Sequence, residues 1–431
     1  MPPRTIRLDG RTRFSIPMAG PTGSLVARPT TYLQGLFHND GARHKLQDIT
    51  HDAFGQYVAI DASTEPGQLF LRMSDRRPPT EYDRSLTTEA ALYFAQQPLL
   101  TTFGDGVQAF VALVGTVIGS PYKVILIDEP EAFLPPPIAR RLGAELTRIV
   151  NERDASLVIA THDADFLMGC IAESRDTAVV RLTYDSGVPT ARGLTPSELA
   201  PMMYHPLFRS TGALHALFHH AAIVTESDAD RAFYDEINHR LQGVGRGIKD
   251  ALFLNAQNWQ TEHEIVRPLR RIGIPAAAVV DLDVILKTGT DWDNLFDACN
   301  VARDRRQHLW TERDYIQSVL LSLYDDKDDV KAVVKKQGLA VLNDADCLRA
   351  HRLLDDLAVY GLFIVPVGEL ESWLNDLQVK GHAARWLIGI FTRIAALQET
   401  EHPLQPGGDD VWVFVDRVAT WINNPRRGGM A

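Results

Sequence analysis

Two adjacent acids, Asp128 and Glu129, stand at the end of an apolar run in this sequence. The run VILIDEPE, residues 124–131, places four aliphatic side chains directly before the acids and a proline after them. Such a run is typical of a buried parallel strand that delivers its last side chains to the carboxyl edge of a sheet. At that edge one acid can hold the metal ion of a magnesium nucleotide, and the second can orient an attacking water. We therefore interpret Asp128 as a magnesium ligand and Glu129 as a catalytic base.

Two further segments follow the order that an ABC-type ATPase requires. GDGVQ, residues 104–108, opens a helical pattern, so its amides and helix dipole can face a phosphate. His162 in IATHD ends the next apolar strand, where an imidazole can contact the γ-phosphate. Each segment alone also fits a turn, a helix cap or an ordinary polar residue, but their common order favours the ATPase fold. The predicted nucleotide-binding residues are Gly104, Asp105, Gly106, Gln108, Asp128, Glu129 and His162.

No GxxxxGK[ST] phosphate loop occurs in this sequence. That loop supplies the amides and the lysine that cradle the β- and γ-phosphates. The nearest segment, AGPTGSLVAR at 19–28, has no Gly-Lys pair and is predicted to be a turn. Three explanations stay open: the loop lies upstream of residue 1, another chain provides it, or hydrolysis is impaired.

A second group of acids follows three other apolar strands. Its members are Glu226 and Asp230 in TESDAD, Asp281 and Asp283 in AVVDLD, and Glu369 and Glu371 in VPVGELES. Acids gathered at strand ends repel one another unless cations neutralise them, and oxygen-only ligands favour Mg²⁺ or Mn²⁺ over zinc. Two such ions could activate water and stabilise the leaving oxygen in phosphodiester cleavage. Single acids at strand ends also cap helices, which is the role we expect for Asp228.

The combination of VILIDEPE and ATHD with the later TESDAD and DLD resembles the OLD (overcoming lysogenization defect) family of ATP-dependent endonucleases. That resemblance implies an ABC-type ATPase joined to a C-terminal Toprim nuclease that cleaves or nicks DNA, with a role in anti-phage defence. It implies Mg²⁺ or Mn²⁺, two ions in each Toprim site, and leaves ATP as a further ligand. It also implies a homo-oligomer formed through the ATPase domains. By matching positions, the six acids named above are the metal ligands, and Lys380 is the basic residue near the scissile phosphate; a solvated surface lysine fits Lys380 equally well.

The elements that position these residues indicate an α/β protein. Strands alternate with helices from Asp105 onward, so ligands are expected at the carboxyl ends of a largely parallel sheet. We predict an ATPase domain that lacks its N-terminal phosphate loop over residues 1–200 and a linker over 201–219. A Toprim domain with a helical insertion at about 291–357 is predicted over 220–431. Its basic residues could contact DNA or form ordinary solvated faces: Arg267, Arg270, Arg271, Arg303, Arg305, Arg306, Lys331, Lys335 and Lys336.

Composition narrows the class of protein. The 45% hydrophobic and 23% charged content is ordinary for a globular protein, and the net charge of -11 argues against a generally basic coat for nucleic acid. Three widely spaced cysteines favour a reducing compartment, and no apolar run is long enough for a membrane span. We therefore expect a cytoplasmic, metal-dependent DNA endonuclease regulated by an ATPase-like module. The alternative is a non-catalytic subunit that docks a partner chain bearing the phosphate loop.

Overall fold

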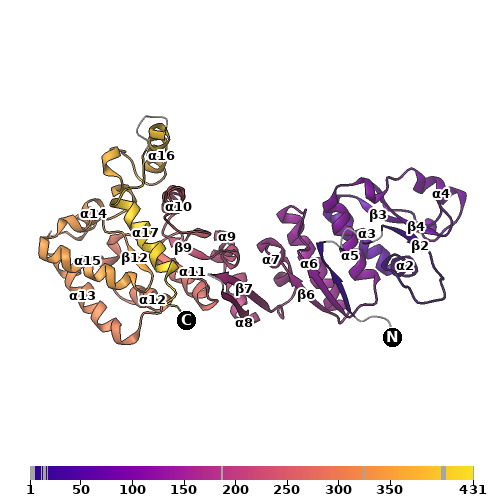
Figure 1. Ribbon diagram of the computed structural model, residues 1–431, viewed down its shortest axis with the longest axis horizontal. Coiled ribbons are helices and arrows are strands. Elements are labelled where there is room, and N and C mark those ends of the chain that lie inside the picture. The colour runs from indigo at the N-terminus through magenta and orange to yellow at the C-terminus, as the bar shows by residue number, and fades with distance from the viewer. Residues whose placement is uncertain are drawn as a thin grey trace. The chain divides into compact units, whose positions relative to one another are not determined.

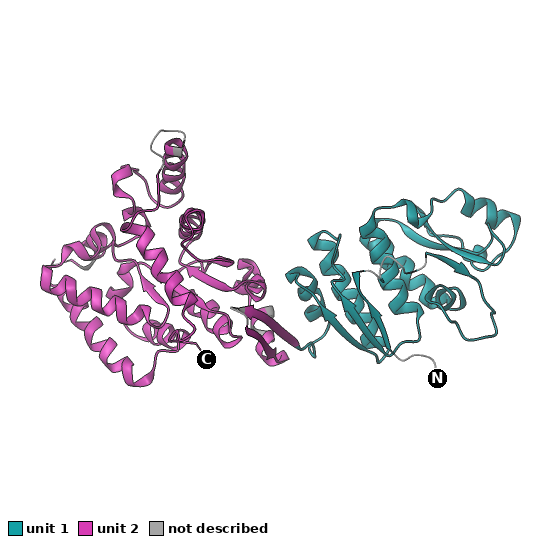
Figure 2. Cartoon of the chain, in the orientation of Figure 1, with its two compact units in different colours: residues 1–178 teal, residues 179–431 magenta. Residues whose placement is uncertain are grey.

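The protein divides into two compact units, residues 1–178 and 179–431 (Figure 2). The computed structural model describes residues 5–10, 12, 16, 18–185, 188–323, 326–398 and 404–430. Strands alternate with helices along much of both units, so the predicted α/β fold class is confirmed (Figure 1).

Unit 1 is built around a three-stranded parallel sheet of order β1-β5-β6. Its strands are β1 (Thr5–Leu8), β5 (Val124–Asp128) and β6 (Ser156–Ala160). Ile125 and Ile127 are buried, whereas Asp128 is exposed at the strand end. This alternation follows from the two-residue repeat of a strand and brings the acid to the edge of the sheet.

The helices and a second sheet complete unit 1. The helices are α2 (Tyr32–His38), α3 (Asp40–Phe54), α4 (Thr88–Ala95), α5 (Asp105–Gly119), α6 (Pro136–Glu152) and α7 (Ala164–Glu173). The second sheet is antiparallel and joins β2 (Ala19–Pro21), β4 (Gln68–Ser74) and β3 (Tyr57–Asp61) in that order. The apolar sides of α5 and α6 share one core with β5, so the ends of α5 and β5 belong to one packed body.

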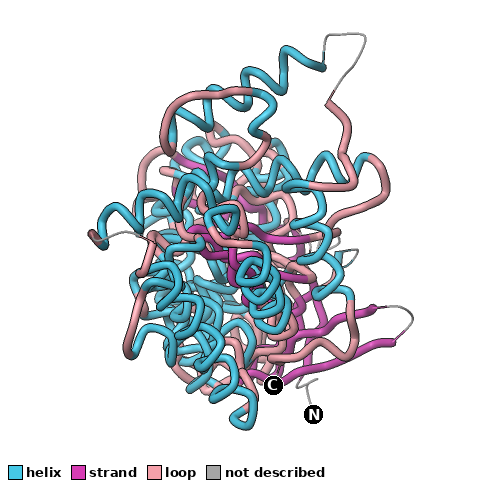
Figure 3. Tube along the Cα trace, turned by 90° about the vertical axis from the view of Figure 1, so that its left-hand side faces the viewer, coloured by secondary structure: helices cyan, strands magenta, loops and turns pink. Residues whose placement is uncertain are grey.

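Unit 2 has a four-stranded, all-parallel sheet of order β10-β9-β11-β12. The strands are β9 (Ala221–Thr225), β10 (Ala251–Asn255), β11 (Ala276–Val280) and β12 (Leu362–Ile364). Every residue of β9 and β11 is buried, as expected for a parallel sheet covered on both faces. Figure 3 distinguishes the strands of the chain (magenta) from its helices (cyan).

Helices and short 3-10 turns cover the sheet of unit 2. The α-helices are α8 (Pro196–Tyr204), α9 (Pro206–Thr211), α10 (Asp228–Gly243), α11 (Trp259–Arg271), α12 (Thr290–Ala298), α13 (Arg303–Leu321), α14 (Lys327–Gln337), α15 (Asp344–Ala358), α16 (Ala384–Gln398) and α17 (Asp410–Asn423). The turns that matter for the site are η4 (Leu282–Leu286) and η6 (Leu370–Ser372). Helices α12 to α15 lie in sequence between β11 and β12, so this segment leaves the sheet at a central strand and returns to it at the edge strand beside β11.

The division between the units falls before a two-stranded hairpin, β7 (Val179–Asp185) and β8 (Val188–Leu194). The sequence analysis placed this hairpin in the first domain, but its arginines bond to unit 2. Arg181 Nε donates to the Leu217 carbonyl over 2.9 Å, and Arg192 donates to the Arg271 carbonyl. The hairpin is therefore part of unit 2.

Candidate functional site

The parallel sheet of unit 2 brings its acids to one edge. Glu226 directly follows β9, and Asp281 directly follows β11. These two strands are hydrogen-bonded neighbours in parallel register, with Thr225 beside Val279. On the other side of β11, strand β12 leads to Glu369 at the start of η6. Because the carboxyl ends of parallel strands share one edge, the three acids converge as their positions in the sequence predict.

Glu226 and Asp281 are joined directly. The backbone N–H of Asp281 donates to Glu226 Oε1 over 2.7 Å. The pKa of the Glu226 carboxyl is raised to about 7, mainly by burial and also by the nearby Asp230 and Asp283 carboxylates. The Asp281 N–H and the charge of Lys335 act in the opposite direction. Burial, followed by the charge of Glu226, also raises the pKa of Asp281 well above its usual range. Two buried acids that oppose each other's ionisation are the electrostatic situation that a bound cation relieves.

Asp230 has a structural role that the sequence analysis did not assign. It forms a capping box at the start of α10, where Ser227 is the N-cap residue. Asp230 Oδ2 accepts from the Ser227 N–H over 3.0 Å and from the Ser227 hydroxyl over 2.6 Å. The predicted cap, Asp228, lies instead in the first turn, where it pairs with Arg231 at 2.7 Å. Burial raises the pKa of the Asp230 carboxyl, so Asp230 belongs to the same electrostatic cluster as Glu226.

Lysines of the helical segment and η4 reach the acids. Lys335 Nζ lies 3.1 Å from Glu369 Oε2 and 3.5 Å from Asp281 Oδ2. Asp283 Oδ2 has two ammonium groups beside it, Lys331 at 3.5 Å and Lys287 at 3.9 Å. Lys331 and Lys335 were predicted only as scattered basic residues. No pattern in the sequence predicted that they meet the acids, because they lie about 50 residues from Asp281 along the chain.

Glu371 faces a different partner. Its Oε1 lies 2.7 Å from His382 Nδ1 and also accepts from the backbone N–H of Ala383. Ligand atoms of Glu369, Glu371 and His382 lie within 4.8 Å of one another. His382 was not predicted as a site residue, although it stands two positions from Lys380. Lys380 itself is exposed in the loop that carries His382.

Glu262 is an acid that the sequence analysis missed. It lies on α11 and is fully buried, and neither of its carboxyl oxygens has a hydrogen-bond partner among the described residues. Burial raises the pKa of Glu262 well above its usual range, and Glu226, Asp230 and Asp281 add to this effect. An amphipathic helix offered no signal that one of its acids would face the core near these residues.

The second candidate site lies in unit 1, at the ends of β5 and β6. His162 Nδ1 is 3.4 Å from Glu129 Oε1 and 3.4 Å from Glu131 Oε1. Glu131 is buried, and its Oε1 accepts from the Thr161 hydroxyl over 2.7 Å and from the His162 N–H over 3.2 Å. The structure therefore brings Glu129 and His162 together as predicted. The buried acid that ties the two strand ends is Glu131, which was quoted in the motif but given no role.

The glycine-rich segment packs against the loop after β5. Gly104 is the N-cap residue of α5, and Gln108 Nε2 donates to the Phe103 carbonyl over 2.6 Å. A Cβ atom added at Gly106 would lie 2.5 Å from the Phe133 carbonyl oxygen, so the backbones meet too closely for a side chain. With Asp105 in its first turn, α5 therefore presents its N-terminus beside residues 133–134.

Residues 98–169, which carry these motifs, match the protein family described as "AAA domain, putative AbiEii toxin, Type IV TA system". This segment is AAA-type ATPase sequence. The AAA segment contains the glycine-rich helix start, Asp128, Glu129 and His162, so the ATPase part of the sequence prediction is confirmed at this level. The match does not extend into unit 2, where the Toprim domain and the nuclease activity stay predictions.

Two solved structures are similar to part of the chain. One is the "Crystal structure of the SmcHead bound to the C-winged helix domain of ScpA", with 13% identity and a TM-score of 0.27. That match covers 36% of this chain and 43% of the other, so this chain spans less than half of it. The other comes from "Structural biochemistry of ATP-driven dimerization and DNA stimulated activation of SMC ATPases", with 10% identity, a TM-score of 0.27, and coverage of 38% and 89%. Among curated proteins, none matches the sequence.

Several basic residues that were expected to contact DNA or to form solvated faces have partners within the protein. Arg270 is fully buried and donates to five backbone carbonyls, which include those of Cys299, Tyr360 and Gly429. Arg306 pairs with Asp297 at 2.6 Å. Of the two alternatives, a solvated face is excluded for the buried Arg270, whose guanidinium is held by backbone carbonyls. Arg306 is held by an ion pair with Asp297, and contact with DNA stays a prediction.

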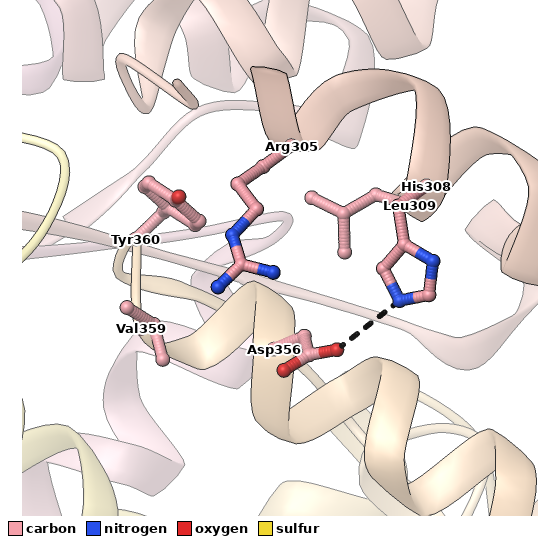
Figure 4. Close-up of a pocket in the computed structure, with 6 residues that line it drawn as sticks. All are labelled: Arg305, His308, Leu309, Asp356, Val359 and Tyr360. Carbon is pink, nitrogen blue, oxygen red and sulfur yellow. Dashed lines mark ion pairs between the residues drawn. The ribbon is translucent and has the colours of Figure 1, made fainter. Parts of the chain in front are cut away.

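Arg305 lines a small pocket between α13 and α15 (Figure 4). The residues around it are Arg305, His308, Leu309, Asp356, Val359 and Tyr360. His308 Nε2 lies 3.9 Å from Asp356 Oδ2, and the Arg305 guanidinium points toward Asp356 and Tyr360. Arg305 therefore faces other residues of the helical segment. Within the described ranges, no helix is long and apolar enough to cross a membrane.

Proposed function

We propose that unit 2 is a Toprim-like nuclease that hydrolyses phosphodiester bonds in DNA with Mg²⁺ or Mn²⁺. The observation that carries the proposal is the joined pair of Glu226 and Asp281 at the ends of two neighbouring parallel strands, 2.7 Å apart through the Asp281 N–H. Carboxylate oxygens are the ligands that these cations prefer. The raised pKa values of both carboxyls also support a bound divalent cation, because the cation would stabilise their ionised forms.

In this proposal each acid of the edge has a task. Glu226 and Asp281 hold the cation, and Asp283 and Glu369 extend the negative edge on which it is bound. Asp230 fixes the first turn of α10 and adds charge behind Glu226. The bound cation supplies the polarisation of a phosphate oxygen and of the attacking water. Glu371 and Lys380 are proposed to face the substrate side of the same edge.

Unit 1 is proposed to control access to this site through nucleotide binding. The AAA segment supports ATP as the ligand, with Asp128 beside the nucleotide's magnesium ion and Glu129 and His162 at the γ-phosphate. We propose that the phosphate-loop lysine reaches this surface from a partner chain and that ATPase domains associate as a homo-oligomer. The matched family's description names a toxin of a toxin–antitoxin system, which supports a role in anti-phage defence.

The test of the nuclease is Asp281→Ala in a plasmid-nicking assay with Mg²⁺ or Mn²⁺. We expect nicking to fall by at least about 100-fold, because the substitution removes a group that stabilises charge in the reaction. Asp228→Ala is the matched control, since Asp228 is an exposed aspartate on the neighbouring strand-to-helix turn that pairs only with Arg231 among the contacts described. Nicking by Asp281→Ala at the wild-type rate would contradict the assignment.

A second function is supported by the lysines at the site. Asp281, Asp283 and Glu369 each have an ammonium group within 4 Å, an arrangement that also suits a site whose acids are held by ion pairs without metal. In that case the chain is a non-catalytic subunit that docks an ATPase partner. Calorimetric titration with Mn²⁺ separates the two functions, because a non-catalytic subunit with ion-paired acids binds no Mn²⁺ at this edge.

A further inference from the structure

Helix α14 places an ammonium group between two acids of the sheet edge. Lys335 Nζ bridges two carboxylates that come from different strands, Asp281 at 3.5 Å and Glu369 at 3.1 Å. Its side chain is 29% exposed, whereas the next residue, Lys336, is fully on the solvent side. A half-buried ammonium between two acids supplies one of the two positive charges that a divalent metal ion would supply there.

The backbone around Lys335 fixes this placement. A Cβ atom added at Gly368 would lie 2.1 Å from the Lys335 carbonyl oxygen, so only glycine permits this approach of α14 to the strand end. The Ser372 hydroxyl donates toward the Lys335 and Lys336 carbonyls over 3.4 and 3.2 Å. Val330 and Val334 are buried on the same helix. Helix α14 is thus held against the loop of Glu369 on both sides of the glycine.

The lysines divide the acids into two groups. Asp281, Asp283 and Glu369 lie within 4 Å of Lys335, Lys331 or Lys287. The contacts described for Glu226 and Glu371 come instead from the Asp281 N–H and from His382 and the Ala383 N–H. Among the contacts described, the lysines therefore reach Asp281, Asp283 and Glu369, whereas Glu226 is contacted by the Asp281 N–H.

We propose that Lys335 is a built-in cation that takes the place of a second divalent ion, so that unit 2 binds one Mg²⁺ or Mn²⁺ at Glu226 and Asp281. This inference rests on the proposed metal-dependent function and differs from the two ions that the sequence resemblance implies. Lys335 is then a positioning residue: it neutralises Glu369 and Asp281 Oδ2, while the Asp281 backbone N–H holds the Glu226 carboxylate.

The test measures how many Mn²⁺ ions each full-length chain binds at equilibrium, by dialysis followed by metal analysis. We expect one ion in the wild type and two in Lys335→Met, because methionine keeps most of the apolar stem and removes the charge. Lys336→Met is the matched control on the same helix and should bind one ion. Two ions in the wild type, or one ion in a folded Lys335→Met, would overturn the inference while leaving the proposed function standing.

A second variant covers the case in which Lys335→Met does not fold. Glu369→Gln removes a carboxylate from the lysine side, so the proposal expects it to keep the single wild-type ion with an affinity changed by less than about threefold. Loss of an ion in Glu369→Gln would overturn the inference, since Glu369 would then be a ligand. No Mn²⁺ bound by the wild type would instead contradict the metal-dependent function itself.

Discussion

Glu226 links the geometry of the metal site to pH. Glu226 is half-buried at the end of β9, and the pKa of its carboxyl is raised to about 7. A protonated carboxyl is a poor metal ligand, so Mn²⁺ must displace the proton at pH values below 7. We expect the affinity for Mn²⁺ to rise about tenfold from pH 6 to pH 8, as one proton is lost from a group of this pKa.

The measurement is calorimetric titration of the full chain at pH 6, 7 and 8. The sign follows from the raised pKa: the proton is held below pH 7 and competes with the metal there. Glu226→Gln should bind Mn²⁺ weakly at every pH and show no such rise. An affinity that stays constant across this range in the wild type would show that Glu226 does not ligate the ion.

Arg270 gives a second prediction at the scale of one residue. Its buried guanidinium donates to carbonyls from β11, from the end of α12 and from the segments beside β12 and the C-terminal helix, and it lies 4.9 Å from the centre of the Trp421 ring. Lysine cannot reproduce this planar set of donors. We expect Arg270→Lys to lower the free energy of unfolding of unit 2 by about 3 kcal/mol or more, as when a buried hydrogen-bonded charge loses its partners.

Chemical denaturation of the full chain measures this loss. Arg271→Lys is the matched control, since Arg271 is the adjacent residue and is exposed. Its effect should stay within about 0.5 kcal/mol, as for most surface substitutions. Equal stability of the two variants would mean that the carbonyls around Arg270 find other donors.

At the scale of elements, Glu131 joins two strand ends. It follows β5, and its Oε1 accepts from Thr161 and His162, which follow β6. Glu131→Ala leaves a part-buried hydroxyl and a part-buried backbone N–H without this acceptor, at a cost of about 1–3 kcal/mol. We expect unit 1 to lose that much stability. Glu152→Ala, at an exposed ion pair on α6, should cost less than about 1 kcal/mol in the same measurement.

The strands and their terminal acids could be predicted because the signal is local. An apolar run such as AAIVT or VILI marks a buried strand, and the next polar residue must lie at its end. Parallel order then brings Glu226 and Asp281 together without further information. The AAA segment was predictable for the same reason, since its motifs follow one another within about 60 residues.

The partners of these acids could not be predicted, because they arrive through tertiary packing. Lys335 lies on α14, within the segment α12 to α15 that joins β11 to β12, so its contact with Asp281 depends on how that whole segment packs. Arg270 and Arg271 are adjacent arginines in the sequence, yet one is buried and the other exposed. Glu262 shows the same limit, since α11 has polar residues all along it and the periodic pattern did not identify which acid would face the core.

At the scale of the whole molecule, each unit has a core of its own. One apolar cluster runs from Leu8 to Cys170, within unit 1, and another runs from Ala221 to Ile422, within unit 2. Independent cores are the usual basis for independent folding. The two units therefore need not unfold together, and a ligand bound by one of them need not stabilise the other.

We expect two thermal transitions in calorimetry of the full chain, of which Mn²⁺ raises only one. A ligand at 100 times its dissociation constant stabilises the unit that binds it by about 2.7 kcal/mol, which is enough to move that transition by several degrees. The variants already described assign the transitions: Arg270→Lys should lower the one that Mn²⁺ raises, and Glu131→Ala should lower the other. If both substitutions and the metal moved one common transition, the units would unfold as a single cooperative body. Nucleotide bound near Glu129 would then stabilise unit 2 as well, without any contact with its acids.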